Sequence, residues 1–235
     1  MIKYPVRDDE LCAFVCKKKG KLFAYINTYI PREKQVFAAA HELFHIWFDK
    51  NNLERPELLN TGTLENETQN VSELKANLFA AILLVPEDAL DNELKLRRMR
   101  QQTISAEDIV KLMSLFFVPY KTMVRRLYEI GFINEKQLKQ FYSIPDRDPQ
   151  NGVLLIRKRL QLSDRSQDRT CEIFFEDLIN NAIKAYDQGK ISEKELRYIL
   201  SLAKQSPESL NLFPEIKENA CDNWDKIMED YDGDE

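Results

Sequence analysis

The stretch VFAAAHELFHIWF, residues 36–48, is apolar apart from three side chains, and it holds both histidines of the chain. Its length and apolar content indicate a buried helix, which we expect to run over residues 31–50. Residues four apart lie above one another on a helix, so His41 and His45 would face the same point. Glu42 would stand beside them.

This pattern predicts a zinc site. Two imidazoles bind zinc about 2 Å from the metal, and the adjacent carboxylate, which is not a ligand, takes a proton from the attacking water. An uncompensated charge in so apolar a helix would cost several kcal/mol, and a bound cation offsets that cost. We expect one zinc ion, with manganese or another divalent ion as the alternative.

A tetrahedral catalytic site needs a third protein ligand and leaves one position for water. A second helix is predicted within NVSELKANLFAAILLVPEDAL, residues 70–90, and Glu73 lies on one face of it with Asn77. Alanines on this helix would let it approach the first one closely. We expect Glu73 to be the third ligand; alternatively, it closes a capping box with Asn70. The other carboxylates considered are Asp49, Glu65 and Glu67.

The first thirty residues predict a β-hairpin. LCAFVC (11–16) and LFAYINTYI (22–30) are rich in β-branched and aromatic residues and flank KKKGK, in which Gly20 suits a tight turn. The predicted fold class is therefore α+β and predominantly α-helical, with a small β-hairpin or sheet packed on the HExxH helix. A helical C-terminal region follows.

Composition gives no sign of a membrane protein. The chain has 235 residues and a net charge of −5, and its apolar run LFAAILLV (78–85) is far shorter than the roughly 20 residues that span a bilayer. The N-terminus lacks the apolar core of a signal peptide. Four cysteines show no repeating framework, so we expect reduced thiols and a cytoplasmic protein.

Two longer motifs carry a family resemblance. INTYIPREKQVFAAAHELFHIWF (26–48), followed by ELKANLFAAILLVP (73–86), resembles the ImmA/IrrE family of zinc peptidases over residues 22–90. The resemblance implies that the metal ligands are His41, His45 and Glu73 and that the general base is Glu42. The chain departs from the family in having Phe44 where glycine is common and Asp49 where histidine is common.

The resemblance also implies a substrate. Family members typically cleave a partner repressor with a helix-turn-helix domain, which lifts repression of prophage, mobile-element or stress genes. Such a repressor is therefore the expected partner. Two alternatives stay open: a non-proteolytic anti-repressor that keeps the metallopeptidase fold as a binding scaffold, and a DNA-binding regulator that acts through residues 105–133.

Residues 105–133 predict two amphipathic helices, with Ser105 as N-cap and Gly131 ending the second. They resemble the helix-turn-helix segment of the family. Over residues 105–130 the net charge is only plus one, a weak footprint for DNA. We expect a helical hairpin packed on the peptidase core, and direct DNA binding is not expected.

Three parts are predicted along the chain. Residues 1–142 form the zinc-peptidase domain, residues 143–170 a linker that begins with SIPDRDPQNG, and residues 171–235 a helical region with an acidic tail. Within the linker, a basic run is expected to be a solvated face: Arg157, Lys158 and Arg159. Residues 171–205 are expected to form two helices.

Overall fold

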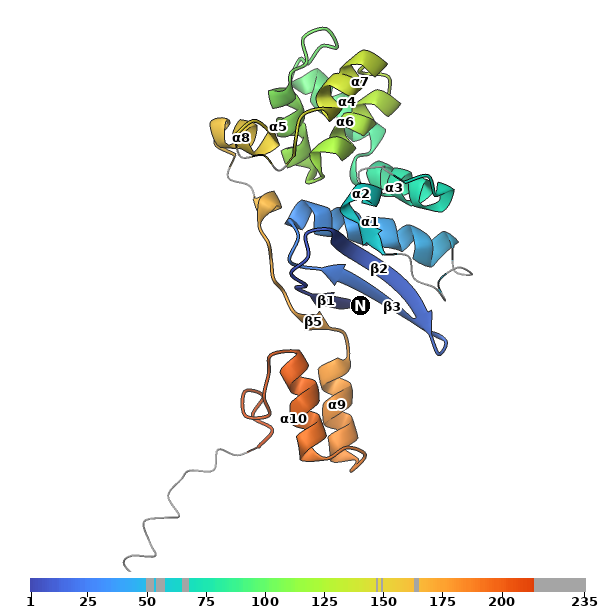
Figure 1. The fold of residues 1–235 in the computed structure, drawn as a ribbon, viewed down its shortest axis with the longest axis vertical. Helices are drawn as coiled ribbons and strands as arrows, with labels where there is room; N and C mark the ends of the chain where they lie inside the picture. The colour runs from blue at the N-terminus through green and yellow to red at the C-terminus, as the bar shows by residue number, and fades with distance from the viewer. Residues whose placement is uncertain are drawn as a thin grey trace, which may run out of the picture. The chain divides into compact units, whose positions relative to one another are not determined.

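The computed structural model describes residues 1–49, 53, 58–64, 68–146, 148, 150–162 and 165–213. The chain forms two compact units, the first ending at Phe174 and the second beginning at Phe175. The first unit combines a small sheet with many helices, which confirms the predicted helix-rich α+β fold (Figure 1).

The sheet has the strand order β4-β2-β3-β1-β5. Its strands are β1 Ile2–Tyr4, β2 Leu11–Lys18, β3 Lys21–Asn27, β4 Leu59–Asn60 and β5 Phe174–Phe175. The predicted hairpin is confirmed: β2 and β3 are antiparallel, and β1 runs parallel to β3. Lys19 and Gly20 form the turn with φ values of 50° and 76°. A two-residue turn with positive φ at both positions matches the twist of the strands.

The predicted metal-binding helix is α1, Arg32–Phe48, with Pro31 at its N-cap. It packs on one face of the sheet, where Ala13 and Ile26 join Phe37 in a buried cluster. Helix α3, Val71–Leu84, packs on α1 and contributes Ala80 and Ala81 to the same cluster. Because alanine is small, the two helices approach closely enough for longer side chains on them to meet.

Five further helices of the first unit build a second core: α4 Glu87–Leu96, α5 Ala106–Phe116, α6 Tyr120–Glu129, α7 Glu135–Tyr142 and α8 Val153–Arg159. Two short elements lie against the first layer instead: α2 Thr61–Leu64 contacts β4, and the 3-10 helix η1 Arg165–Gln167 contacts α1. Ser105 caps α5 through a capping box, and Gly131 ends the α6 segment with φ 73°, as predicted. Phe117, which ends α5, adopts a left-handed conformation with φ 57°.

Helix α6 is held against the end of α3. Its Arg126 is buried, and Nε donates to the carbonyl of Val85 at 3.1 Å. Nη1 of the same side chain contacts Glu129 at 3.0 Å. The predicted packing of this helical hairpin on the peptidase core is therefore confirmed.

The basic run on α8 is not wholly solvated, so that expectation was wrong for Arg157, which is 5 % exposed. Val153 of the same helix belongs to the second core, which turns Arg157 inward one turn later. The chain then returns to the sheet, where Cys171 N–H donates to the carbonyl of Thr28 at 3.0 Å. The first compact unit extends to Phe174.

The second unit is a helical hairpin. It contains α9, Leu178–Asp187, and α10, Glu193–Leu202, and Ser192 forms the predicted capping box with Glu195. The first helix begins at residue 178 rather than 171, because Asp177 has a positive φ of 59°. The predicted acidic tail lies outside the described residues.

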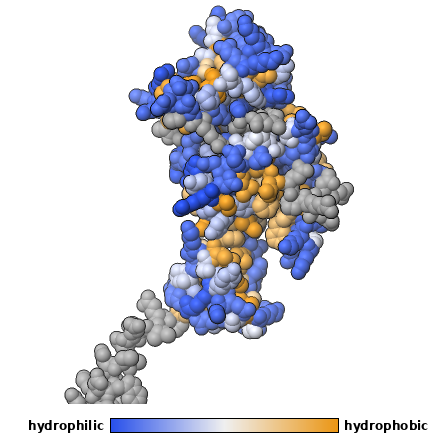
Figure 2. Space-filling model, in the orientation of Figure 1, coloured by the Kyte–Doolittle hydropathy of each residue, from blue (hydrophilic) through white to orange (hydrophobic). Residues whose placement is uncertain are grey.

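The surface of the first unit is uneven in polarity. Figure 2 shows hydrophobic side chains gathered over the strands, where Leu22 and Phe23 are exposed. Phe14 and Tyr25 stack on this outer face with ring centroids 5.0 Å apart. Among the helices that the structure describes, none combines the length and the apolar content needed to cross a membrane.

Candidate metal centre

Helices α1 and α3 bring His41, His45 and Glu73 to one buried point, where their ligand atoms all lie within 4.8 Å of one another. The two Nε2 atoms of the histidines are 3.1 Å apart. Oε2 of Glu73 lies 3.0 Å from His41 Nε2, and Oε1 lies 3.3 Å from His45 Nε2. The three side chains that the sequence selected therefore converge.

These spacings fit a tetrahedral metal. Ligand atoms about 2.0–2.1 Å from zinc, at the tetrahedral angle, are about 3.3 Å from one another. Within the described part of the chain, this is the one group of His, Cys, Asp or Glu side chains with such proximity. Two ring nitrogens and a carboxylate that face each other in a buried space are a donor set that a divalent cation satisfies.

The outer nitrogen of His41 has a buried partner that the sequence did not assign. Nδ1 lies 2.8 Å from Oδ1 of Asn77, and Nδ2 of Asn77 donates to the carbonyl of Thr63 at 2.7 Å. The second bond orients the amide so that its oxygen faces His41. Nδ1 then carries the proton and Nε2 keeps its lone pair for the metal. The sequence could have indicated this role of Asn77, because Asn77 lies one helical turn after Glu73.

Asp49 lies behind His45 rather than at the centre of the cluster. Its Oδ2 is 3.5 Å from His45 Nδ1 and accepts a hydrogen bond from Ser72 Oγ at 2.8 Å. The alternative role of Glu73 as a cap is also resolved, because Asn70 accepts from Ser72 N–H and Glu73 reaches the histidines. Glu65 and Glu67 lie outside the described residues.

The comparison with known families agrees with this arrangement. Residues 11–128 match the family model Peptidase M78, described as the IrrE N-terminal-like domain, which covers half of the chain. The chain belongs to the ImmA/IrrE family. It therefore carries a metallopeptidase-type domain, and the histidine and glutamate cluster indicates a divalent metal. Among curated proteins, none matches the chain significantly.

The family position that often holds glycine carries a packing role in this ImmA/IrrE member. The ring of Phe44 contacts His45 edge-on, with centroids 5.6 Å apart. The same ring lies 5.8 Å from Phe79 of α3. Phe44 therefore supports the imidazole of His45 from the side and ties α1 to α3.

Electrostatics within the cluster favour an ionised carboxylate. Burial alone would raise the pKa of Glu73, but hydrogen bonds and charge from His41 and His45 lower it to about 2. Burial would likewise lower the pKa of His45, yet the hydrogen bond and charge of Glu73 outweigh it and raise the pKa. Glu73 is therefore ionised, which is the form of a carboxylate that binds a cation.

Glu42 occupies a different environment from Glu73. It is 3 % exposed, and burial raises its pKa to about 8. The charge of His45 lowers this pKa, the charge of Glu73 raises it, and a backbone hydrogen bond from Val15 lowers it. A carboxyl that changes protonation state near neutral pH is suited to taking up and releasing a proton. A bound cation would shift this balance toward the ionised form.

Three polar side chains lie near the metal-binding helix in sequence and could stabilise an oxyanion, but each has another contact. Tyr25 OH donates to the carbonyl of Tyr4 at 3.0 Å. Tyr29 lies under the guanidinium of Arg169, 4.3 Å from its ring centroid. Arg32 lies 5.9 Å from the ring centroid of Phe117. The geometry assigns none of them to the metal cluster.

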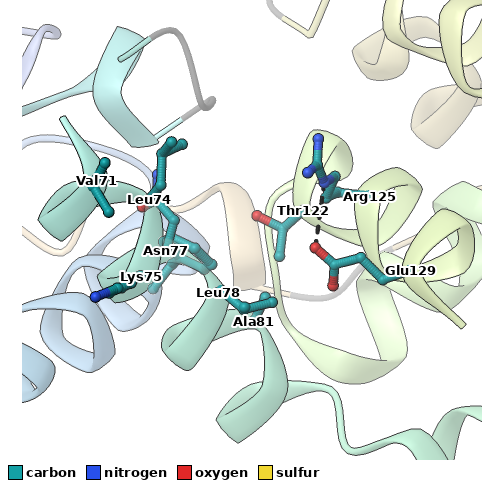
Figure 3. A pocket seen from close by; sticks show the side chains of 10 residues that line it. Val71, Leu74, Lys75, Asn77, Leu78, Ala81, Thr122, Arg125 and Glu129 are labelled. Carbon is teal, nitrogen blue, oxygen red and sulfur yellow. Dashed lines mark hydrogen bonds and ion pairs between the residues drawn. The ribbon is translucent and has the colours of Figure 1, made fainter. Parts of the chain in front are cut away.

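A pocket of about 240 Å³ lies between α3 and α6 (Figure 3). Leu74, Leu78 and Ala81 line it from α3, and the ion pair of Arg125 and Glu129 borders it from α6. Asn77 also lines this pocket, so one amide borders the pocket and holds His41.

Replacing Asn77 with alanine should weaken metal binding about 10–100-fold, the usual effect of losing a side chain that orients a metal-bound histidine. The physical reason is that His41 loses the acceptor that fixes its tautomer. Competition with a calibrated chelator measures the affinity. Leu78→Ala, on the same helix and in the same pocket, is the matched control and should bind metal like the wild type.

The metal-free protein should lose stability as pH rises. The pKa of Glu42 is raised from 4.5 to about 8 in the folded state, so the fold keeps a proton that the unfolded chain has released. Between about pH 5.5 and 8, this group alone should lower the free energy of unfolding by about 3 kcal/mol. Urea denaturation of chelator-treated protein at both pH values measures this loss.

Glu42→Gln is the control for that measurement, because the amide does not titrate. Glu33, whose pKa burial raises to about 7, remains in both proteins and contributes the same slope to each. Equal pH dependence in wild type and variant would show that Glu42 does not titrate in this range.

Proposed function

We propose that this chain is a zinc-dependent endopeptidase that cleaves a partner helix-turn-helix repressor. The observation that carries the peptidase proposal is the geometry of one cluster. Two histidine nitrogens and a glutamate oxygen lie 3.0–3.3 Å apart, with the buried carboxylate of Glu42 next to His41 on the same helix.

A zinc ion held by His41, His45 and Glu73 would polarise both the attacking water and the substrate carbonyl. Glu42 accepts the proton of the water at its carboxylate and then delivers it to the nitrogen of the leaving amine. Glu42 is buried beside the cluster, which shields the proton that the carboxyl holds between the two transfers from bulk water. Asn77 and Asp49 keep the two imidazoles oriented throughout.

The substrate proposal rests on the family resemblance. Cleavage of a repressor within or beside its DNA-binding domain would lift repression of prophage, mobile-element or stress genes. The α6 surface supports a protein substrate over a DNA ligand. Its exposed positions include Arg125 and Glu129, which pair with each other at 3.2 Å, while Arg126 is buried. Little unpaired positive charge is left on that helix for phosphate contacts.

Quantitative proteomics of cells that express the wild-type protein tests the substrate proposal. We expect a helix-turn-helix protein to be depleted, with fragments that share one new terminus, and His41→Ala expression is the reference. If no helix-turn-helix protein is cleaved while other proteins are, the peptidase proposal stands and the repressor proposal fails. If nothing is cleaved by metal-loaded protein under inducing conditions, both proposals fail.

A further inference from the structure

A second buried polar region lies at the N-terminal end of α1. A cavity of about 440 Å³ opens there among α1, α5, α6, α8 and η1. Glu33 lines it and precedes His41 by eight residues, which corresponds to about 12 Å along the helix. None of the metal-cluster side chains lines this cavity, so it is a separate site.

Two polar atoms in the wall lack a hydrogen-bond partner among the described residues. They are Oε2 of Glu33 and the hydroxyl of Tyr120, on residues that are 4 % and 1 % exposed. The other oxygen of Glu33 is satisfied, because Gln167 Nε2 donates to Oε1 at 2.6 Å. Buried polar atoms are nearly always bonded. The carboxylate oxygen of Glu33 can only accept, and the phenol of Tyr120 can accept or donate, so the cavity has a place for a ligand that donates hydrogen bonds.

The charged side chains that line the cavity are three carboxylates, on Asp9, Glu33 and Asp146, and two cations, on Lys34 and Arg169, so the wall carries one more negative than positive group. Burial raises the pKa of Glu33 to about 7, although the hydrogen bond from Gln167 and the charges of Arg157 and Lys34 oppose the shift. The positive groups near it therefore do not compensate its burial. Arg169 at the exposed edge is engaged with Asp9, with 2.9 Å between Nη1 and Oδ1.

The environment of Tyr120 also favours a positively charged ligand. Burial raises the pKa of this phenol, and the carboxylate of Asp146 raises it further. The carboxylate of Asp146 places negative potential at the hydroxyl. A cation between Glu33 and Tyr120 would be attracted to both ends of the cavity.

We propose that this cavity binds a small organic cation, an amine or amidine attached to an apolar body. The cationic group donates hydrogen bonds to Oε2 of Glu33 and to the hydroxyl of Tyr120. The apolar body contacts Met113, Val153 and Leu154, which also line the cavity. The cavity volume falls within the roughly 300–1,000 Å³ of small-molecule sites. This site is independent of the proposed peptidase activity.

Calorimetric titration of the full chain with benzamidine tests the proposal, and benzamide is the neutral probe of the same shape. At pH 8, above the pKa of about 7, Glu33 is mainly ionised. We expect one benzamidine per chain and at least about tenfold weaker binding of benzamide. Glu33→Gln should weaken benzamidine binding at least about tenfold, whereas Glu87→Gln, an exposed carboxylate on α4, should leave it unchanged.

A second variant tests the location without altering charge. Leu154→Trp fills the cavity and should abolish benzamidine binding, while metal content and far-ultraviolet circular dichroism stay those of the wild type. Two results would overturn the proposal. One is no benzamidine binding up to about 10 mM. The other is binding that Glu33→Gln and Leu154→Trp both leave unchanged.

Discussion

Replacing Glu42 with glutamine is expected to abolish peptide hydrolysis while the metal stays bound. Glutamine keeps the size and shape of the side chain but cannot accept a proton. Loss of a general base lowers the rate about 10²–10⁴-fold. The measurement is the fraction of intact repressor over time after mixing with metal-loaded protein, together with elemental analysis for metal content.

Two features make this variant informative. Glu42 is buried next to His41 but is not among the three converging side chains, so its loss should leave their geometry intact. Removing a buried carboxyl with a pKa near 8 also removes a source of instability at neutral pH. The variant should therefore fold at least as well as the wild type. Glu87→Gln is the control for the substitution itself.

The same variant separates a protease from a binding regulator. If Glu42→Gln relieves repression as well as the wild type does and the repressor stays intact, binding alone accounts for the function. Relief that requires both Glu42 and a cleaved repressor supports the peptidase. Cleavage at the wild-type rate by the variant would remove Glu42 from the role of base.

The sequence could predict the parts of the site that depend on one helix. His41 and His45 are four residues apart, and the helical period alone brings them to one side. Glu73 was also predicted, but its distance from the histidines depends on how closely α3 packs on α1. The family resemblance and the alanines of α3 supplied that information, and the structure agrees.

Other features depend on contacts between distant segments, and local patterns do not encode them. Arg157 belongs to a polar run, yet tertiary packing of α8 buries it. The two-residue strands β4 and β5 are too short for any alternation of polarity to show. The cavity beside Glu33 is lined by residues from five elements, so its existence depends on the complete fold.

Asp49 illustrates how sequence distance can mislead. It follows His45 by one turn and was considered as a ligand on that ground. Its carboxylate reaches the Nδ1 side of the imidazole, whereas His41 and Glu73 converge on Nε2. A carboxylate in that position orients the histidine and raises its basicity. The two carboxylates should therefore respond differently to the same chemical change.

Glu73→Ala should lower metal affinity by more than about a hundredfold, because it removes one of three ligands, whereas Asp49→Asn should lower it about 10–100-fold at most. Metal content after dialysis against a weak chelator, followed by competition titration, measures both effects. His41→Ala is the reference for loss of a ligand.

Which of the two variants loses more metal affinity identifies the third ligand. If Asp49→Asn loses the metal and Glu73→Ala retains it, Asp49 is the third ligand and Glu73 is the supporting carboxylate. Because Ser72 Oγ donates to Asp49 from the first turn of α3, Ser72→Ala should then weaken binding as well.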